Sequence, residues 1–176
     1  MDEGSTERVK ALEVAINNEA REREFYLKHM ERTSNPHGKA MFASIADDEL
    51  EHLRRLQVLH QRLQAEGKWP ETLPLEVKGT AVKSIMKKLV DSVDTSSKAD
   101  SDDVEAVKVA IEFEAKGEAF YRDLRDRVEN PTEKRFYDLL ATMEREHRLS
   151  LEDTLVFFQD PESWFRVKEK HTFDGA

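Results

Sequence analysis

A duplicated helical motif constrains this chain more than any other feature of its sequence. The pattern Glu-x-x-His occurs at Glu49 and His52 and again at Glu144 and His147. Residues three apart share a face of an α-helix, so each copy places a carboxylate beside an imidazole. Around both pairs the apolar residues recur at steps of three and four, as on the buried side of an amphipathic helix. The sequence therefore predicts two long helices that each carry a Glu and a His on their inner face.

The two motifs belong to an internal repeat whose offset is 95 residues, the separation of His52 and His147. The halves align without a gap from about residue 9 to residue 52. Ala15-Ile16 matches Ala110-Ile111, and Asn35-Pro36 matches Asn130-Pro131. A self-similar chain uses one structural unit more than once. The repeat therefore predicts two equivalent helical hairpins.

Each predicted hairpin has one further carboxylate at an inner position, Glu19 in the first and Glu114 in the second. Glu49 follows Glu19 by 30 residues, and the turn is expected about halfway between them. In an antiparallel hairpin the two carboxylates then reach the same level. Buried carboxylates need partners, so these groups are either hydrogen-bonded Glu–His pairs or metal ligands. The metal alternative is a dinuclear site formed by Glu19, Glu49, His52, Glu114, Glu144 and His147.

The expected fold is all-α: an antiparallel four-helix bundle made of two repeated hairpins, in a single domain over residues 1–176. Its expected parts are repeat 1 at about 5–66, a long crossover at 67–101, repeat 2 at about 102–159 and a C-terminal tail at 160–176. Asn35 and Asn130 are predicted helix N-caps, because each precedes a proline at the first helical position. Gly67 is predicted to end the second helix. A short helix is expected over 80–90, and the tail is expected to pack on the bundle.

Composition narrows the possible partners and compartments. The net charge of −9 argues against binding to nucleic acid or to anionic membranes. No apolar run approaches the ~20 residues of a membrane-spanning helix, and the first residues lack the features of a signal peptide. The chain has no cysteine, which excludes disulfides and thiolate metal ligands. These features lead us to expect a cytoplasmic protein.

The repeated pattern resembles the rubrerythrin branch of the ferritin-like superfamily. The resemblance rests on Ala-Ile-x-x-Glu, followed two turns later by Phe-Tyr, in residues 15–26 and 110–121, and on the Glu-x-x-His pairs. It implies a ferritin-like bundle with two iron ions bound by the six residues named above, and we expect Glu49 and Glu144 to bridge them. It also implies that Tyr26 and Tyr121 donate to the ligand carboxylates. Manganese or zinc can substitute for iron at such ligands.

The same resemblance implies an oxidoreductase that reduces hydrogen peroxide or oxygen, with two departures from the family pattern. Rubrerythrins proper carry a rubredoxin iron site built from four cysteines, which this chain lacks. Electrons are therefore expected from a separate donor such as a rubredoxin-like protein. The family also has an extra carboxylate three residues after the third-helix Glu, where this chain has Gly117. The repeat equivalent of Gly117 is Glu22. Glu22 is either a seventh carboxylate ligand or a side chain on a solvated helix face.

Several alternatives stay open from sequence. Two alternatives to a peroxide-reducing oxidoreductase remain. One is an iron-binding, ferrous-oxidising protein of ferritin type, and the other is a helical bundle that metal only stabilises. A homodimer is a family-level expectation. Arg23 and Glu118 hold matching repeat positions and either form an ion pair across the bundle or flank the site. Each ligand histidine is expected to donate its second ring N–H to an acceptor that the sequence does not identify.

Overall fold

The computed structural model describes residues 3–70, 82, 84, 85, 88 and 99–173, and within them the chain is helical and has no strand. The helices are α1 (Glu3–Arg32), α2 (Pro36–Glu66), α4 (Ser101–Arg127), α5 (Pro131–Gln159) and α6 (Pro161–Phe173). The predicted all-α class is confirmed, and the bounds of α2 and the end of α5 coincide with those expected. The short helix expected over 80–90 lies largely outside the described residues, of which 82, 84, 85 and 88 are helical.

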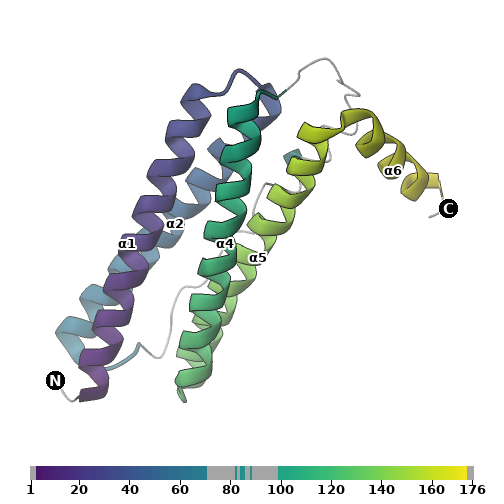
Figure 1. The fold of residues 1–176 in the computed structure, drawn as a ribbon. Coiled ribbons are helices and arrows are strands. Elements are labelled where there is room, and N and C mark those ends of the chain that lie inside the picture. The colour runs from purple at the N-terminus through teal and green to yellow at the C-terminus, as the bar shows by residue number, and fades with distance from the viewer. Residues whose placement is uncertain (1–2, 71–81, 83, 86–87, 89–98, 174–176) are drawn as a thin grey trace.

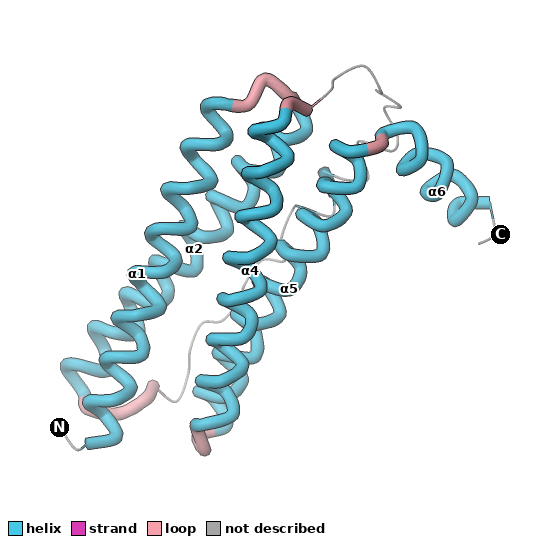
Figure 2. The backbone as a smooth tube through the Cα atoms, in the orientation of Figure 1, coloured by secondary structure: helices cyan, strands magenta, loops and turns pink. Residues whose placement is uncertain are grey.

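Four of these helices form a bundle of two hairpins (Figures 1 and 2). Within the hairpins α1 packs closely against α2 and α4 against α5, while α1 faces α4 and α2 faces α5 more loosely across the bundle. Figure 1 shows the two hairpins side by side, with their short turns at opposite ends of the bundle. No helix in the described part of the chain has the length and apolar character needed to cross a bilayer.

Local capping explains where the hairpins turn. The side chain of Asn35 accepts hydrogen bonds from the backbone N–H groups of His37 and Gly38, each at 3.0 Å. Asn130 caps α5 in the same way. Such caps are worth about 1 kcal/mol each. At the end of α2, Gly67 adopts a left-handed conformation with φ of 70°, which glycine accepts without the strain of a side chain.

The C-terminal tail forms a helix, α6, that the sequence reasoning did not predict. Asp160 caps it by accepting from the backbone N–H of Ser163 at 3.0 Å, and Pro161 starts it. Trp164 and Phe165 are buried and pack against Phe157 of α5. The tail therefore anchors itself on the end of the bundle through aromatic contacts, although Figure 1 shows α6 running away from the bundle axis.

Two apolar clusters fill the bundle and leave a polar layer between them. The first, nearer the α1–α2 turn, includes Tyr26, Phe42, Ala46, Ala110 and Leu151. The second, nearer the α4–α5 turn, includes Ala15, Leu56, Leu59, Tyr121 and Ala141. On each helix of the bundle the acidic and imidazole residues of interest lie between a member of one cluster and a member of the other. The packing therefore fixes the depth of this layer along all four helices.

Candidate metal centre

The polar layer brings together all six residues that the sequence singled out. Glu19 is 2% exposed, and the other five side chains are 0% exposed. Their potential ligand atoms form two groups, within each of which the atoms lie within 4.8 Å of one another. The His52 group consists of Glu19, Glu49, His52 and Glu144, and the His147 group of Glu49, Glu114, Glu144 and His147. Glu49 and Glu144 belong to both, which is the position that bridging carboxylates occupy between two ions.

In the His52 group, one ring nitrogen faces three carboxylates. Nδ1 of His52 lies 3.2 Å from Oε2 of Glu19, 3.3 Å from Oε2 of Glu49 and 3.6 Å from Oε1 of Glu144. These residues come from α1, α2 and α5. Glu19 and Glu49 therefore lie at the same level of the hairpin, as their equal distance from the turn predicts.

In the His147 group, the two ring nitrogens have different surroundings. Nδ1 of His147 lies 3.3 Å from Oε1 of Glu49 and 3.4 Å from Oε2 of Glu114. Its Nε2 lies 3.1 Å from Oδ2 of Asp48. The two oxygens of Glu49 thus face the Nδ1 atoms of different histidines.

Two tyrosines each donate a hydrogen bond to a carboxylate of the opposite hairpin, either Glu114 or Glu19. The hydroxyl of Tyr26 on α1 donates to Oε1 of Glu114 on α4, and the hydroxyl of Tyr121 on α4 donates to Oε1 of Glu19 on α1. Both rings are buried within the apolar clusters. The crossed pair occupies one oxygen of each carboxylate and leaves the other oxygen facing the centre.

Burial and mutual repulsion change the pKa values of the carboxylates. Burial, followed by repulsion from Glu49, raises the pKa of Glu19 to about 8. The same two causes raise the pKa of Glu144 well above its ordinary value. Burial acts to raise the pKa of Glu49 too, but its close contacts with Glu19, His147 and His52 hold it below its usual range. Without a metal, the cluster therefore retains protons at neutral pH.

The histidines respond in the opposite direction. Burial acts to lower the pKa of His52, but its hydrogen bonds with Glu19 and Glu49 raise it to about 10. The pKa of His147 is also raised, because attraction to Glu114 and the hydrogen bond with Asp48 outweigh burial. Metal ligands must lose such protons, so binding of a divalent ion here releases protons.

The donor set fits two divalent metal ions. Among the described residues, no hydrogen-bond partner satisfies five buried atoms that face the centre: Oε1 of Glu49, Oε2 of Glu114, both carboxyl oxygens of Glu144 and Nδ1 of His147. Leaving such groups unsatisfied costs several kcal/mol. Four carboxylates balance the charge of two divalent ions, and oxygen and imidazole ligands suit iron, manganese or zinc.

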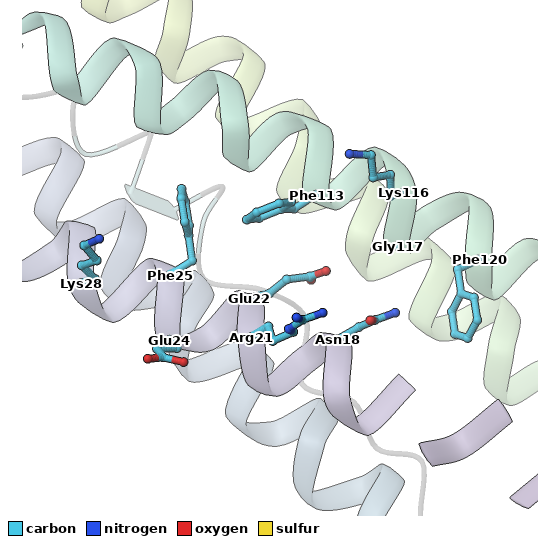
Figure 3. Close-up of a pocket in the computed structure, with 10 residues that line it drawn as sticks. All are labelled: Asn18, Arg21, Glu22, Glu24, Phe25, Lys28, Phe113, Lys116, Gly117 and Phe120. Carbon is cyan, nitrogen blue, oxygen red and sulfur yellow. The ribbon is translucent and has the colours of Figure 1, made fainter. Parts of the chain in front are cut away.

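A pocket of about 730 Å³ opens at the surface between α1 and α4, and its lining includes Glu22 and Gly117 (Figure 3). Glu22 extends from α1 into this pocket, towards the stretch of α4 that holds Gly117. Glu22 is half-buried. Burial, followed by repulsion from Glu49 and Glu114, raises its pKa to about 10. Glu22 is therefore partly shielded from solvent within the pocket.

The missing side chain of Gly117 leaves the space that the Glu144 carboxylate occupies. A β-carbon added at Gly117 lies 2.7 Å from Oε2 of Glu144 and 3.2 Å from its Cδ. The space that a side chain at this position requires is therefore filled by the shared carboxylate of α5.

Replacing Gly117 by alanine is expected to weaken metal binding while leaving the fold stable. Alanine favours a helix by about 1 kcal/mol over glycine, so the free energy of unfolding without metal stays level or rises. The new methyl group displaces the Glu144 carboxylate, and affinity for divalent ions falls about 10-fold, as for other changes that misorient a ligand. Calorimetric titration with zinc and thermal denaturation measure the two effects. Lys116→Ala on the same helix turn is the control, and equal affinities in the two variants contradict the role given to Gly117.

Sequence reasoning missed Asp48, and it left two alternatives open for Arg23 and Glu118. Asp48 approaches His147 from the other hairpin, so no spacing along the chain relates them. The ion pair considered between Arg23 and Glu118 does not form. Glu118 instead pairs with Arg122 at 2.5 Å and Arg148 at 3.1 Å on its own hairpin, and the buried Nε of Arg23 has no partner among the described residues.

The helical hairpins and the buried Glu/His cluster define a ferritin-like metal-binding bundle. A family model described as Rubrerythrin matches residues 10–98, half of the chain. The chain belongs to the rubrerythrin family. The match includes Glu19, Glu49 and His52, whereas the corresponding residues of the second repeat lie beyond it. No curated protein and no solved structure matches the chain.

Proposed function

We propose that this protein is a di-iron redox protein that reduces hydrogen peroxide, or oxygen, with electrons from a separate donor protein. The observation that carries the proposal is the convergence of two overlapping groups of ligand atoms that share Glu49 and Glu144. Membership of the rubrerythrin family supports iron as the metal. Reduction of one peroxide consumes two electrons and two protons and yields two water molecules.

The site residues have distinct tasks in this proposal. The six ligands would hold two iron ions, which when bound supply the two electrons. Tyr26 and Tyr121 orient the carboxylates of Glu114 and Glu19. The apolar clusters on both sides exclude bulk water, which strengthens the electrostatic interactions within the layer.

The pocket between α1 and α4 supports entry of a small oxidant. Its lining includes Phe25, Phe113 and Phe120 together with Glu22 and Gly117. A volume of about 730 Å³ far exceeds what peroxide or oxygen requires. The 176 residues contain no cysteine and so no four-cysteine iron site, which supports a separate electron donor.

Rapid mixing of the iron-loaded protein with oxidant tests the proposal. Protein loaded anaerobically with two ferrous ions per chain is expected to be oxidised by peroxide faster than by oxygen, with one peroxide consumed for two irons. Repeated cycles are expected once an external reductant is supplied. Iron loading and peroxide consumption are measured on the same sample. A loaded protein that reacts with neither oxidant contradicts the proposal, and uptake of many ferrous ions per chain favours the ferritin-type alternative.

A further inference from the structure

The two halves of the metal centre are less alike than the repeat suggests. Nε2 of His147 lies 3.1 Å from Asp48, whose side chain is only 17% exposed. The corresponding atom of His52, Nε2, is buried and has no hydrogen-bond partner in the part of the chain that the structure describes. The repeat explains the difference, because the position equivalent to Asp48 is Met143.

Asp48 determines which ring nitrogen of His147 carries the proton and which is free to bind a metal ion. Since the carboxylate accepts the proton on Nε2, the lone pair of the neutral ring resides on Nδ1, which faces Glu49 and Glu114. Such a carboxylate partner fixes the ring orientation and makes the imidazole a stronger ligand. His52 lacks this support, because Met143 is a buried apolar side chain that offers at most a weak sulfur acceptor.

We propose that the two metal positions are inequivalent, and that the His147 position binds a divalent ion first and more tightly because Asp48 supports the histidine of that position alone. The His52 position, with Met143 at the place equivalent to Asp48, takes the second ion more weakly. The inference deepens the proposed function and shares its metal centre, but it concerns affinity and order of filling, not turnover.

Titration with zinc tests the order of filling without redox chemistry. In protein labelled with ¹⁵N-histidine, substoichiometric zinc is expected to shift the ring nitrogens of His147 first. The signals of His52 are expected to move only as the second equivalent binds. The signals are assigned by substituting each histidine in turn. Calorimetry of the same protein is expected to resolve two steps whose dissociation constants differ at least about 10-fold.

One pair of variants tests whether Asp48 causes the asymmetry. Asp48→Asn is expected to weaken the first step about 10- to 100-fold and the second step much less. The exposed neighbour Asp47 supplies the control, because Asp47→Asn removes the same charge from the same helix turn.

The possible outcomes separate this inference from the proposed function. Filling of the His52 position first, equal filling of both, or equal effects of Asp48→Asn and Asp47→Asn overturn the inference while leaving a two-ion centre in place. Failure to bind zinc overturns both the inference and the metal centre. Slow or absent peroxide turnover in protein that fills the His147 position first contradicts the proposed function alone.

Discussion

The variant Glu49→Gln is expected to lose binding of two ions per chain. Glu49 directs Oε2 towards Nδ1 of His52 and Oε1 towards Nδ1 of His147, each at 3.3 Å. Glutamine keeps the size of the side chain but removes its charge and one of its two carboxylate oxygens, so it cannot bridge. We expect at most one ion per chain, and an affinity for the second ion reduced by more than about 100-fold, beyond the usual effect of an outer-shell change.

Metal analysis after gel filtration and calorimetric titration with zinc measure this change. Glu51→Gln is the matched control, because Glu51 lies on the same helix and pairs with Arg55 away from the centre. Circular dichroism checks that both variants remain helical. Two ions bound by Glu49→Gln with the affinity of the control would exclude a bridging role for Glu49.

Removal of metal is expected to produce the second large effect, a loss of thermal stability. An ion at 1,000 times its dissociation constant stabilises the folded state by about 4 kcal/mol. For a chain of this length, about 2–4 °C of melting temperature corresponds to each kcal/mol. Chelation is therefore expected to lower the melting temperature by roughly 8–16 °C, which differential scanning calorimetry measures with and without added zinc.

The loss of thermal stability on removal of metal is expected to grow as the pH rises, because the metal-free cluster holds protons. The pKa of Glu19 is raised to about 8 and that of His52 to about 10, so the folded chain keeps protons that the unfolded chain releases. Stability from such groups is present at low pH and is lost as the pH rises through the folded-state values. Each retained proton lowers the free energy of unfolding by about 1.4 kcal/mol per pH unit.

Melting temperatures of metal-free and zinc-loaded protein between pH 6 and pH 9 test this dependence. The melting temperature of the metal-free protein is expected to fall steadily over the range. That of the loaded protein is expected to change less, because the metal has already displaced the protons. Parallel curves, or a metal-free protein that gains stability as the pH rises, would show that the cluster does not hold these protons.

The sequence supplied the helices and the depth of the polar layer because both depend on local spacing. Asn35 and Asn130 cap their helices where the Asn-Pro pairs predict. Glu19 and Glu49 meet at one level because they are equally far from the same turn. The helical tail was missed, because the proline after Asp160 was interpreted only as part of a packed tail, whereas it begins α6.

What the sequence determined by itself is therefore the repeat, the hairpins and the six acidic and imidazole residues of the inner faces. All of these follow from periodicities of three and four and from capping residues, which act over one or two turns of helix. Only the tertiary structure decided which groups meet across the hairpins. Tyr26 donates to Glu114, Tyr121 donates to Glu19, and Asp48 supports His147. The physical reason is that such contacts depend on the relative rotation and depth of separate helices, which packing of the two apolar clusters sets and no local spacing encodes.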